Sequence, residues 1–353
     1  MKTYKNLYPE ICDFANLHAA YRRARCGKRD RAAVASFEFD LERNLLQLQE
    51  ELRSHTYAPG GYTNFYIHEP KRRLVSAAPF RDRVVHHALC HVIEPIWEAR
   101  FIGTSYACRV GKGTHRAMDQ CHGWVRRYRY ALQGDIVKYF PSIDHQILEA
   151  LLAKHIADHE ALWLIQRLLA SGEGIQAEDH PPIYYPGDDL FAALRPRGLP
   201  IGTLTSQFWA NVYLHELDMF VKHELHCPAY LRYMDDFVLF ADDKHTLHAW
   251  KDAIQTLLAA RLRLELHPKK SLVFPVQVGL EFCGFRIYPT HRRLRRSAIR
   301  RFVGRFRRQR EAFRGGKLSL EKMSESVRCW IAHAAHGDTW RLRQRLFADY
   351  PLL

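Results

Sequence analysis

The sequence lacks the cysteine spacings that would build a zinc site or a disulfide framework. It holds 8 cysteines in 353 residues, but they are scattered, with no CxxC pair and no Cys/His spacing of the zinc-finger kind. We therefore expect reduced, mostly structural thiols in a cytoplasmic protein. His86, His87 and His91 could share one helix face, but such clusters are more often buried or solvated than bound to a metal.

Long apolar runs are missing as well. The N-terminal segment reads MKTYKNLYPEICDF and has no apolar core of the kind that a signal peptide carries. No uninterrupted apolar run approaches the roughly eighteen residues that a membrane-spanning helix needs. The sequence therefore predicts a soluble protein that has no membrane partner.

Acidic residues are too few to balance the basic ones. Lysine and arginine number 53 against 38 aspartates and glutamates, which gives a formal net charge of +15. Such an excess predicts a polyanionic partner, although a solvated cationic face is the ordinary alternative. The excess is greatest from His291 to Arg314, where 11 arginines accompany a single acid, Glu311.

The spacing of apolar residues predicts a mixed protein of helices and strands, without an internal repeat. Helices are predicted over residues 36–53 and 246–260, and in segments that begin after Pro79 and after Pro200. Strands are predicted over 131–137 and 279–288, and two β-rich runs at 229–241 predict a hairpin. Residues 172–198 are rich in Gly, Pro and acids and predict a surface excursion. The fold class is therefore α+β.

Three aspartates stand beside these predicted strands. Asp135 lies near the end of the first strand, and Asp235 and Asp236 lie at the tip of the hairpin. If that strand pairs with the hairpin, the three carboxylates meet, and carboxylates between apolar flanks are costly unless a cation neutralises them. Two divalent ions about 3.5–4 Å apart can drive extension of a nucleic-acid strand. A polar turn whose acids face water is the alternative interpretation.

Two motifs contain these aspartates. Residues 233–236 read YMDD and resemble the YxDD box of reverse transcriptases, while residues 134–144 read GDIVKYFPSID and resemble the preceding metal-binding motif of that family. The resemblance implies RNA-templated DNA synthesis with two Mg²⁺ ions, or Mn²⁺ in their place. The implied catalytic metal ligands are Asp135, Asp235 and Asp236, and Ile136 is their neighbour at the implied metal site.

Further segments resemble the family's motifs in the same order, across about residues 60–290. Phe140 stands where family members carry the aromatic that blocks a ribose 2′-hydroxyl, with a core aromatic as the alternative. Residues 70–85 and 101–118 resemble two fingers motifs. These imply that Arg73, Arg81 and Arg109 contact the incoming nucleotide or template, with Lys112 as a further phosphate contact. Pairing of Arg81 with Asp82 or with solvent stays open.

Two later segments complete the resemblance. Residues 264–271 read LELHPKKS and resemble the lysine-bearing loop beyond the catalytic hairpin. Lys269 or Lys270 would there protonate or neutralise the leaving pyrophosphate, and we assign Lys269 to the nucleotide site. Residues 279–287 read GLEFCGFRI and resemble the primer-grip hairpin.

The most informative motif is RGLPIGTLTSQFWANVYL at residues 197–214. The pattern IGxxxSQ is typical of reverse transcriptases of diversity-generating retroelements, whereas retroviral and group II intron enzymes usually have QGxxxSP. Those retroelements copy a template-repeat RNA into cDNA with errors at adenines, and work with a small basic accessory variability protein. Ile201, Gly202 and Gln207 would then border the nucleotide, and branched Ile201 would loosen the pocket opposite adenine. Simple packing of these positions is the alternative.

The resemblance implies a right-hand polymerase fold with an antiparallel palm sheet and a helical thumb. We assign N-terminal helices and fingers to 1–130, the palm to 131–290 with a fingers-side excursion at about 145–198, and a basic thumb to 291–353. Partners would be dNTPs, an RNA template and an RNA–DNA duplex, in a bacterial or phage-encoded enzyme. The thumb arginines assigned to the duplex are Arg295, Arg296, Arg300 and Arg301.

Other functions fit parts of this pattern. A group II-like or defence-associated reverse transcriptase keeps the chemistry without the diversifying role. A catalytically inactive nucleic-acid-binding module would keep the fold, but the intact acidic set argues against it. A metal-dependent nuclease would use the same carboxylates, but it would have no use for an aromatic sugar gate.

Overall fold

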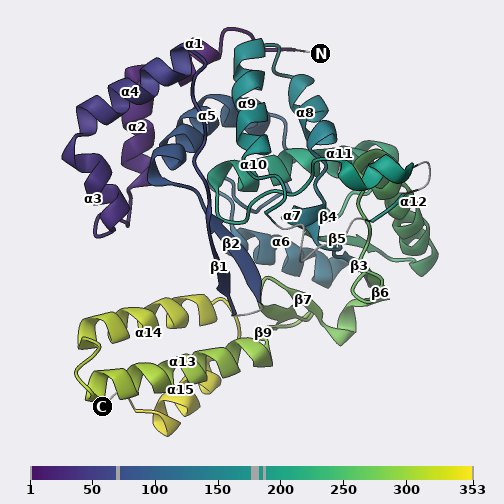
Figure 1. The fold of residues 1–353 in the computed structure, drawn as a ribbon. Coiled ribbons are helices and arrows are strands. Elements are labelled where there is room, and N and C mark those ends of the chain that lie inside the picture. The colour runs from purple at the N-terminus through teal and green to yellow at the C-terminus, as the bar shows by residue number, and fades with distance from the viewer. Residues whose placement is uncertain (1, 69–71, 176–182, 186–187, 352–353) are drawn as a thin grey trace.

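The computed structural model describes residues 2–68, 72–175, 183–185 and 188–351. This part of the chain combines helices with three antiparallel sheets, of two, four and three strands (Figure 1). Much of the predicted excursion at 172–198 lies outside the described residues. Within those that are described, no helix is both long and apolar enough to cross a membrane.

Four short helices at the N-terminus pack around one long helix. Their bounds are α1 Tyr8–Ile11, α2 Phe14–Ala24, α3 Ala32–Phe39, α4 Leu41–Arg53 and α5 Phe80–Glu98. The helix predicted after Pro79 is confirmed as α5. The single helix predicted over 36–53 is wrong, because Asp40 adopts φ −130° and ψ 58° and so separates α3 from α4. Leu45, Leu48 and Leu52 of α4 are nevertheless buried, as their helical spacing predicts.

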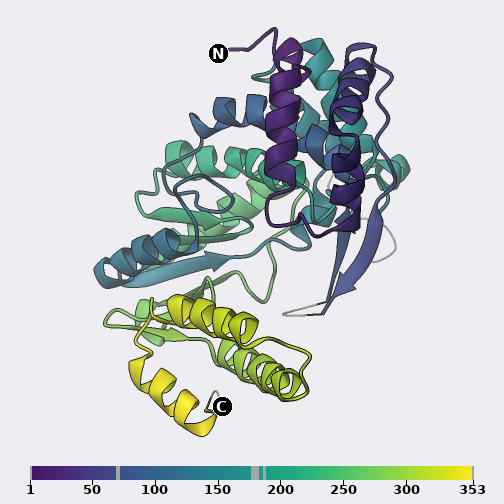
Figure 2. The same ribbon diagram turned by 90° about the vertical axis from the view of Figure 1, so that its left-hand side faces the viewer.

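A two-stranded hairpin projects from this helical region toward the C-terminal helices (Figures 1 and 2). It consists of β1 (Thr63–Ile67) and β2 (Arg73–Ala77), paired antiparallel. All five residues of β1 are exposed, whereas Ser76 of β2 is buried. The main-chain N–H of Ser76 donates to the carbonyl of Ile201 over 2.8 Å, which joins the hairpin to the loop that carries the IGxxxSQ motif.

The four-stranded sheet, here called the central sheet, has the strand order β4-β5-β3-β6. Its strands are β3 Tyr130–Gly134, β4 Tyr230–Tyr233, β5 Asp236–Ala241 and β6 Leu272–Pro275. The predicted hairpin is confirmed as β4 and β5. The strand predicted over 131–137 ends earlier, at Gly134, because Ile136 and Val137 leave the sheet and pair with Leu266 and Glu265.

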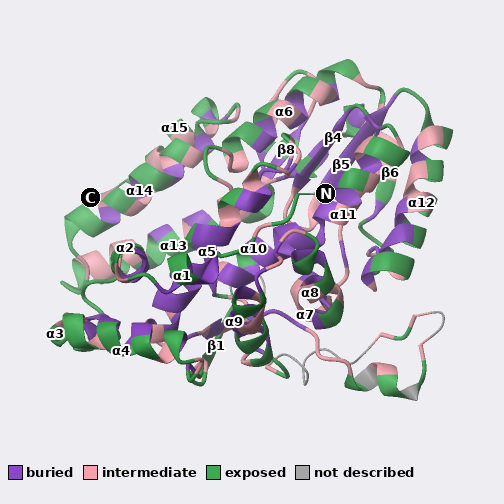
Figure 3. Ribbon diagram, turned by 90° about the horizontal axis from the view of Figure 1, so that it is seen from above, coloured by how far each residue is buried: buried purple, intermediate pink, exposed green. Residues whose placement is uncertain are grey.

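The two faces of the central sheet contribute to separate hydrophobic clusters. Side chains alternate along a strand, so Leu132 and Leu239 belong to one cluster and Ala131 and Val238 to the other. Helix α6 (Thr114–Arg127) and the C-terminal helices complete the second cluster. Figure 3 shows that buried residues concentrate in α5, α10 and the strands β4 and β5 of the central sheet. The first cluster includes the N-terminal helices α1 to α5 together with five later helices. These are α8 His145–Ala153, α9 His159–Ala170, α10 Leu204–Tyr213, α11 His215–Met219 and α12 Lys244–Leu262.

The helices predicted after Pro200 and over 246–260 are confirmed as α10 and α12. Short turns connect the remaining parts of this region. They are α7 Tyr139–Ser142, the 3₁₀ turns η1 Leu190–Leu194 and η3 Val276–Val278, and the π turn η2 Phe220–Glu224.

The C-terminal residues form a module set apart from the helices at the N-terminus (Figure 2). A three-stranded sheet begins it: β7 Leu280–Phe282, β8 Phe285–Ile287 and β9 Arg292–Leu294. Three helices follow: α13 Arg296–Arg314, α14 Leu320–Ala334 and α15 Trp340–Asp349. The rings of Phe302 and Trp330 stack 3.8 Å apart at its core. The boundary that we placed at 290–291 falls inside this sheet, because β9 pairs with β8.

Candidate active site

The turn between β4 and β5 presents Asp235. Tyr233 pairs with Asp236 across the hairpin, which leaves Met234 and Asp235 as a two-residue turn. Met234 has a φ of 59°, and tight hairpins of this length require residues in the left-handed region. The strained position of the turn is thus occupied by Met234, whose side chain is unbranched, and the carboxylate of Asp235 follows immediately.

Strand β3 brings Asp135 alongside that turn. Gly134 is in register with Phe237 on β5, so the next residue of β3 lies beside Asp236. A Cβ atom at Gly134 would overlap the ring of Phe237. Glycine is therefore required directly before Asp135, because only its bare Cα permits the two strands to approach with this ring between them.

The three aspartates line one cavity of about 680 Å³. Of the other predicted site residues, Ile136, Phe140, Arg73 and Ile201 also contribute to its wall. Sequence reasoning did not assign Tyr66, Arg72 or His267 to this cavity. The remaining lining residues are Leu74, Val137, Lys138, Tyr139, Pro141 and Lys270.

The cavity wall carries the basic side chains of Arg73 and Lys270 together with the three aspartates. The Nζ atom of Lys270 lies 2.9 and 2.8 Å from the two carboxylate oxygens of Asp135. Burial raises the pKa of the Asp235 carboxyl and the Asp135 carboxylate raises it further, whereas Arg73 and Lys270 act in the opposite direction. A divalent cation beside Asp235 would relieve the cost of keeping that buried carboxylate charged.

The donor chemistry of the site fits hard divalent cations. Asp135, Asp235 and Asp236 offer carboxylate oxygens, which Mg²⁺ prefers as ligands. Among the described residues, no group of three His, Cys, Asp or Glu side chains is arranged as a ready-made metal cage. Both oxygens of Asp135 instead bind Lys270. The site therefore supplies suitable ligands, and Lys270 competes with a divalent ion for one of them.

The structure distinguishes between the two adjacent lysines. Both lysines are exposed, but Lys270 lines the cavity and Lys269 does not. The main chain around Lys270 is tied to the catalytic strand, because His267 N–H donates to the carbonyl of Asp135 over 2.8 Å. Of the two lysines, Lys270 rather than the predicted Lys269 therefore lies on the cavity wall.

The residues of the IGxxxSQ motif separate in space. Ile201 lines the cavity, and Gly202 next to it has a φ of 134° with its Cα close to Ser76 of β2. Gln207 is exposed on α10 and is not on the cavity wall. Ser206 bonds the hydroxyl of Thr203 over 2.7 Å at the start of α10. Of the two distinguishing positions of the motif, Ile201 alone reaches the cavity.

The three predicted nucleotide-contacting arginines also separate. Arg73 lines the cavity. Arg81 pairs with Glu51 and lies over the ring of Tyr57. Arg109, whose side chain is 5% exposed, makes a bidentate pair with Glu98 and donates to two main-chain carbonyls. For Arg81 and Arg109 the structure thus shows protein partners rather than a place on the cavity wall.

Other predicted basic residues lie away from the cavity. Lys112 is half-buried, and its Nζ donates to the carbonyl of Gly103. In the C-terminal module, Arg295 pairs with Glu281 over 2.8 Å. Arg296, Arg300 and Arg301 are exposed on α13, as a surface that binds phosphates requires.

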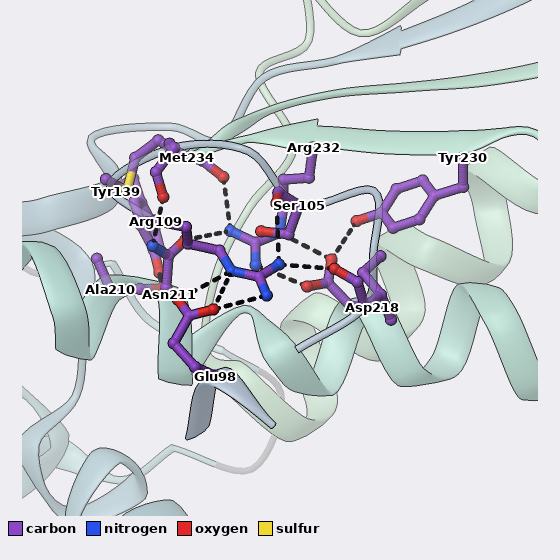
Figure 4. A network of polar contacts seen from close by, with 12 residues as sticks. Glu98, Ser105, Arg109, Tyr139, Ala210, Asn211, Asp218, Tyr230, Arg232 and Met234 are labelled. Carbon is purple, nitrogen blue, oxygen red and sulfur yellow. Dashed lines mark hydrogen bonds and ion pairs between the residues drawn. The ribbon is translucent and has the colours of Figure 1, made fainter. Parts of the chain in front are cut away.

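The sequence analysis did not identify a role for one arginine beside the β4–β5 turn. Arg232 of β4 is fully buried against Asp218 of α11, and its guanidinium also reaches the carbonyl of Met234 (Figure 4). A signal was present, because an arginine within a run of apolar strand residues requires a buried acidic partner. The partner is 14 residues away in sequence, which no strand or helix periodicity relates to Arg232.

Comparison with known proteins gives these observations a context. Residues 67–287 match the family model for reverse transcriptase (RNA-dependent DNA polymerase). The chain is 26% identical over 280 residues to the protein YkfC of Escherichia coli, covering 68% of this chain and 70% of that protein. It is 23% identical over 355 residues to the group II intron-encoded protein LtrA of Lactococcus lactis, covering 82% of this chain and 56% of LtrA.

A shorter match is to nuclear intron maturase 1 of Arabidopsis thaliana, which is mitochondrial. It is 31% identical over 100 residues, or 28% of this chain and 14% of that protein. The chain thus spans over two thirds of YkfC but only about half of LtrA. The matched family region, 67–287, contains all three aspartates of the cavity.

Proposed function

This chain belongs to the reverse transcriptase family of RNA-dependent DNA polymerases, and from that premise we propose that it diversifies a gene by copying a template-repeat RNA into adenine-mutagenised cDNA. Membership of this family makes the chain an RNA-directed DNA polymerase. The observation that supports catalysis is the meeting of Asp135, Asp235 and Asp236 on one cavity wall. The observation that supports the diversifying role is Ile201 of the IGxxxSQ motif on that same wall.

In the proposed mechanism, Asp135, Asp235 and Asp236 would hold two Mg²⁺ ions, with Ile136 as their neighbour at the site. Bound there, the ions would supply activation of the primer 3′-hydroxyl and stabilisation of charge on the reacting phosphates. Arg73 supplies a cation to the triphosphate, and Lys270 balances or protonates the departing pyrophosphate. Phe140, which lines the cavity, would exclude a ribose 2′-hydroxyl, so that deoxynucleotides would be preferred.

The arrangement of the elements suggests the place of the nucleic acid. We assign the central sheet to a palm, the β1–β2 hairpin and N-terminal helices to fingers, and α13, α14 and α15 to a thumb. The hairpin and the C-terminal helices approach each other from opposite sides (Figure 1). The basic surface of α13 would bind the phosphates of the RNA–DNA duplex, and a small basic accessory variability protein is the further partner that we propose.

The polymerase chemistry is tested by primed DNA synthesis on an RNA template with dNTPs and Mg²⁺. Asp235→Asn should abolish product while the protein stays folded. Asp252→Asn is the matched control, because Asp252 is an exposed acid on α12 and does not line the aspartate cavity. Equal product from wild type and Asp235→Asn would contradict the proposal and favour a nucleic-acid-binding module.

The diversifying role is tested by sequencing the cDNA made in the presence of the accessory protein. Errors should cluster opposite template adenines, and Ile201→Gln should lower them, because a polar side chain would again border the nucleotide. Gln207→Pro is the informative comparison, since Gln207 belongs to the same motif but does not reach the cavity. Errors spread evenly over the four template bases would keep the polymerase and reject the diversifying role.

A second candidate is a group II-like reverse transcriptase without that role. It is favoured by the relative LtrA, whose name states that a group II intron encodes it. The two candidates differ in their genomic surroundings. A nearby pair of imperfect repeats that differ at adenines supports the first, and flanking intron RNA sequence supports the second.

A further inference from the structure

Arg232 forms a buried ion pair behind the catalytic turn. Both Arg232 and Asp218 have side chains that are 0% exposed. The Nε atom of Arg232 lies 2.7 Å from Oδ1 of Asp218, and Nη2 lies 2.6 Å from Oδ2 (Figure 4). Tyr230 adds a hydrogen bond of 2.7 Å from its hydroxyl to Oδ1 of Asp218. Removing two charges from water is costly, so such a pair is weak evidence of stability and calls for another explanation.

The third nitrogen of Arg232 supplies that explanation. Nη1 donates to the main-chain carbonyl of Met234 over 3.0 Å and to Oδ1 of Asn211 over 3.0 Å. The amide of Asn211 is itself oriented, because its Nδ2 donates to the carbonyl of Ala107 over 2.9 Å. The guanidinium therefore holds the carbonyl that immediately precedes Asp235 in the chain.

That carbonyl belongs to the strained residue of the turn. Met234 has a φ of 59°, and a residue other than glycine is strained in the left-handed region and persists there only when its surroundings hold it. The peptide that carries the Met234 carbonyl also carries the N–H of Asp235. Its orientation therefore determines where the Asp235 carboxylate points.

The main chain of Arg232 is held as well. Its N–H donates to the carbonyl of Thr104, and its own carbonyl accepts from the N–H of Tyr106, both over 3.0 Å. The arginine cannot shift along the strand without breaking these bonds. Arg232 is thus held at both ends, its main chain by the loop at 104–106 and its guanidinium by Asp218.

We propose that Arg232 is a positioning residue for catalysis, which locks the left-handed Met234 peptide so that the Asp235 carboxylate is aimed into the cavity, with Asp218 holding the guanidinium in place. This inference rests on the polymerase chemistry of the cavity and is independent of the diversifying role. A purely structural role, in which the pair only joins β4 to α11, makes different predictions for metal binding.

The first variant is Arg232→Lys in the full chain. Lysine retains the charge opposite Asp218 but lacks the planar fork that also reaches Met234. Since groups that orient metal ligands typically change metal affinity or activity 10–100-fold, we expect about a tenfold higher Mg²⁺ concentration for half-maximal synthesis. Mn²⁺ binding, measured by the loss of the free-ion electron paramagnetic resonance signal, should weaken about as much. The KM for dNTP should change far less.

The matched control is Glu98→Gln. Glu98 is the acidic partner of the other arginine network near this turn, that of Arg109 (Figure 4), and contacts neither Met234 nor Asp235. It should lower Tm without changing the Mg²⁺ requirement or Mn²⁺ binding. If Arg232→Lys leaves both metal readouts at the wild-type value, or if Glu98→Gln shifts them equally, the positioning role is rejected.

A second pair of variants covers the case in which Arg232→Lys does not fold. Asp218→Asn keeps the size of the side chain but loosens its hold on the guanidinium, and it should raise the Mg²⁺ requirement in the same direction. Adding Met234→Gly to either variant should restore much of the metal affinity, because glycine adopts a positive φ without strain. Folded Asp218→Asn with unchanged metal binding, or no recovery from Met234→Gly, would overturn the proposal.

Discussion

Lys270 and Asp135 form an ion pair on the wall of the cavity that the three aspartates line, with Nζ within hydrogen-bonding distance of both carboxylate oxygens. One carboxylate thereby has two competing partners, a lysine from the loop before β6 and the metal proposed at this site. Lys270 could leave Asp135 when the metal binds and turn toward the pyrophosphate. The neighbouring Lys269 has no such partner on the cavity wall.

The first prediction compares the replacement of Lys270 with the replacement of Lys269. Lys270→Ala should lower kcat for nucleotide addition by about 10²-fold, the usual size of a general acid's contribution, whereas Lys269→Ala should have a much smaller effect. Lys270→Arg should recover only part of the rate, because arginine keeps the charge but does not give up a proton at working pH. Single-turnover kinetics measure this, and equal losses from Lys270→Ala and Lys269→Ala would contradict it.

A second prediction concerns Gly134. Gly134→Ala should destabilise the fold by roughly 1–3 kcal/mol, as overpacking of a core typically does, and should lower activity because the shift moves Asp135. Gly123→Ala on α6 is the matched control, because the added Cβ there would meet nothing within 4 Å. Chemical denaturation and primer extension measure the two effects. Full activity in Gly134→Ala would show that the close contact with Phe237 is dispensable.

A third prediction tests Phe140 as the sugar gate. Phe140→Ala should raise incorporation of ribonucleotides relative to deoxynucleotides, because the side chain that would exclude the 2′-hydroxyl is removed. The measurement compares kcat/KM for ATP and dATP, and we expect the preference for dATP to fall on the order of 10-fold or more, as for loss of a steric or apolar pocket contact. Phe140→Tyr keeps the ring and should keep the preference. A folded Phe140→Ala with unchanged preference would indicate a packing role.

A fourth prediction concerns the arginines of α13. Arg300→Ala should weaken binding of an RNA–DNA duplex equally for all sequences. It should also reduce the slope of log K against log salt by about 0.9, the value for one lost phosphate contact. Arg22→Ala on α2 is a control that removes an exposed cation from the N-terminal helices. A titration at several salt concentrations gives both slopes, and a slope unchanged by Arg300→Ala would place the duplex elsewhere.

A fifth prediction follows from His86, which is buried and bonds the hydroxyl of Thr205 over 2.8 Å. Burial lowers the pKa of His86 to about 3. In the unfolded chain the pKa of histidine is about 6.5, so below that pH the unfolded state binds a proton that the folded state does not. Stability is therefore unaffected by this group above pH 6.5 and falls as pH drops from about 6.5 toward 3, by up to about 1.4 kcal/mol per pH unit.

His86→Gln should make this acid dependence shallower. Glutamine retains a hydrogen-bonding group for Thr205 but takes up no proton in this range. Urea denaturation between pH 4 and pH 8 measures the slope, with His248→Gln, an exposed histidine on α12, as the control. Identical slopes for His86→Gln and wild type would mean that other groups account for acid sensitivity.

Much of the secondary structure follows from local pattern, as α5, α12 and the β4–β5 hairpin illustrate. The errors have specific causes. Asp40 breaks a continuous helical pattern because its backbone leaves the helical region, and β9 is a strand because β8 offers it an edge. Neither cause is visible in the spacing of apolar residues.

The sequence by itself was enough to predict the family. The YMDD turn and the motif a hundred residues earlier resemble those of reverse transcriptases, and the apolar flanks of their three aspartates indicated a cation, because carboxylates in apolar surroundings are costly without one. The tertiary structure decided which neighbours serve them. In the folded chain, Lys270 lines the cavity and Lys269 does not, and Ile201 lines it whereas Gln207 does not. Arg81 and Arg109 instead pair with acidic residues of the protein. The tertiary structure also paired Arg232 with Asp218, because partners separated in sequence are joined only when helices and strands pack.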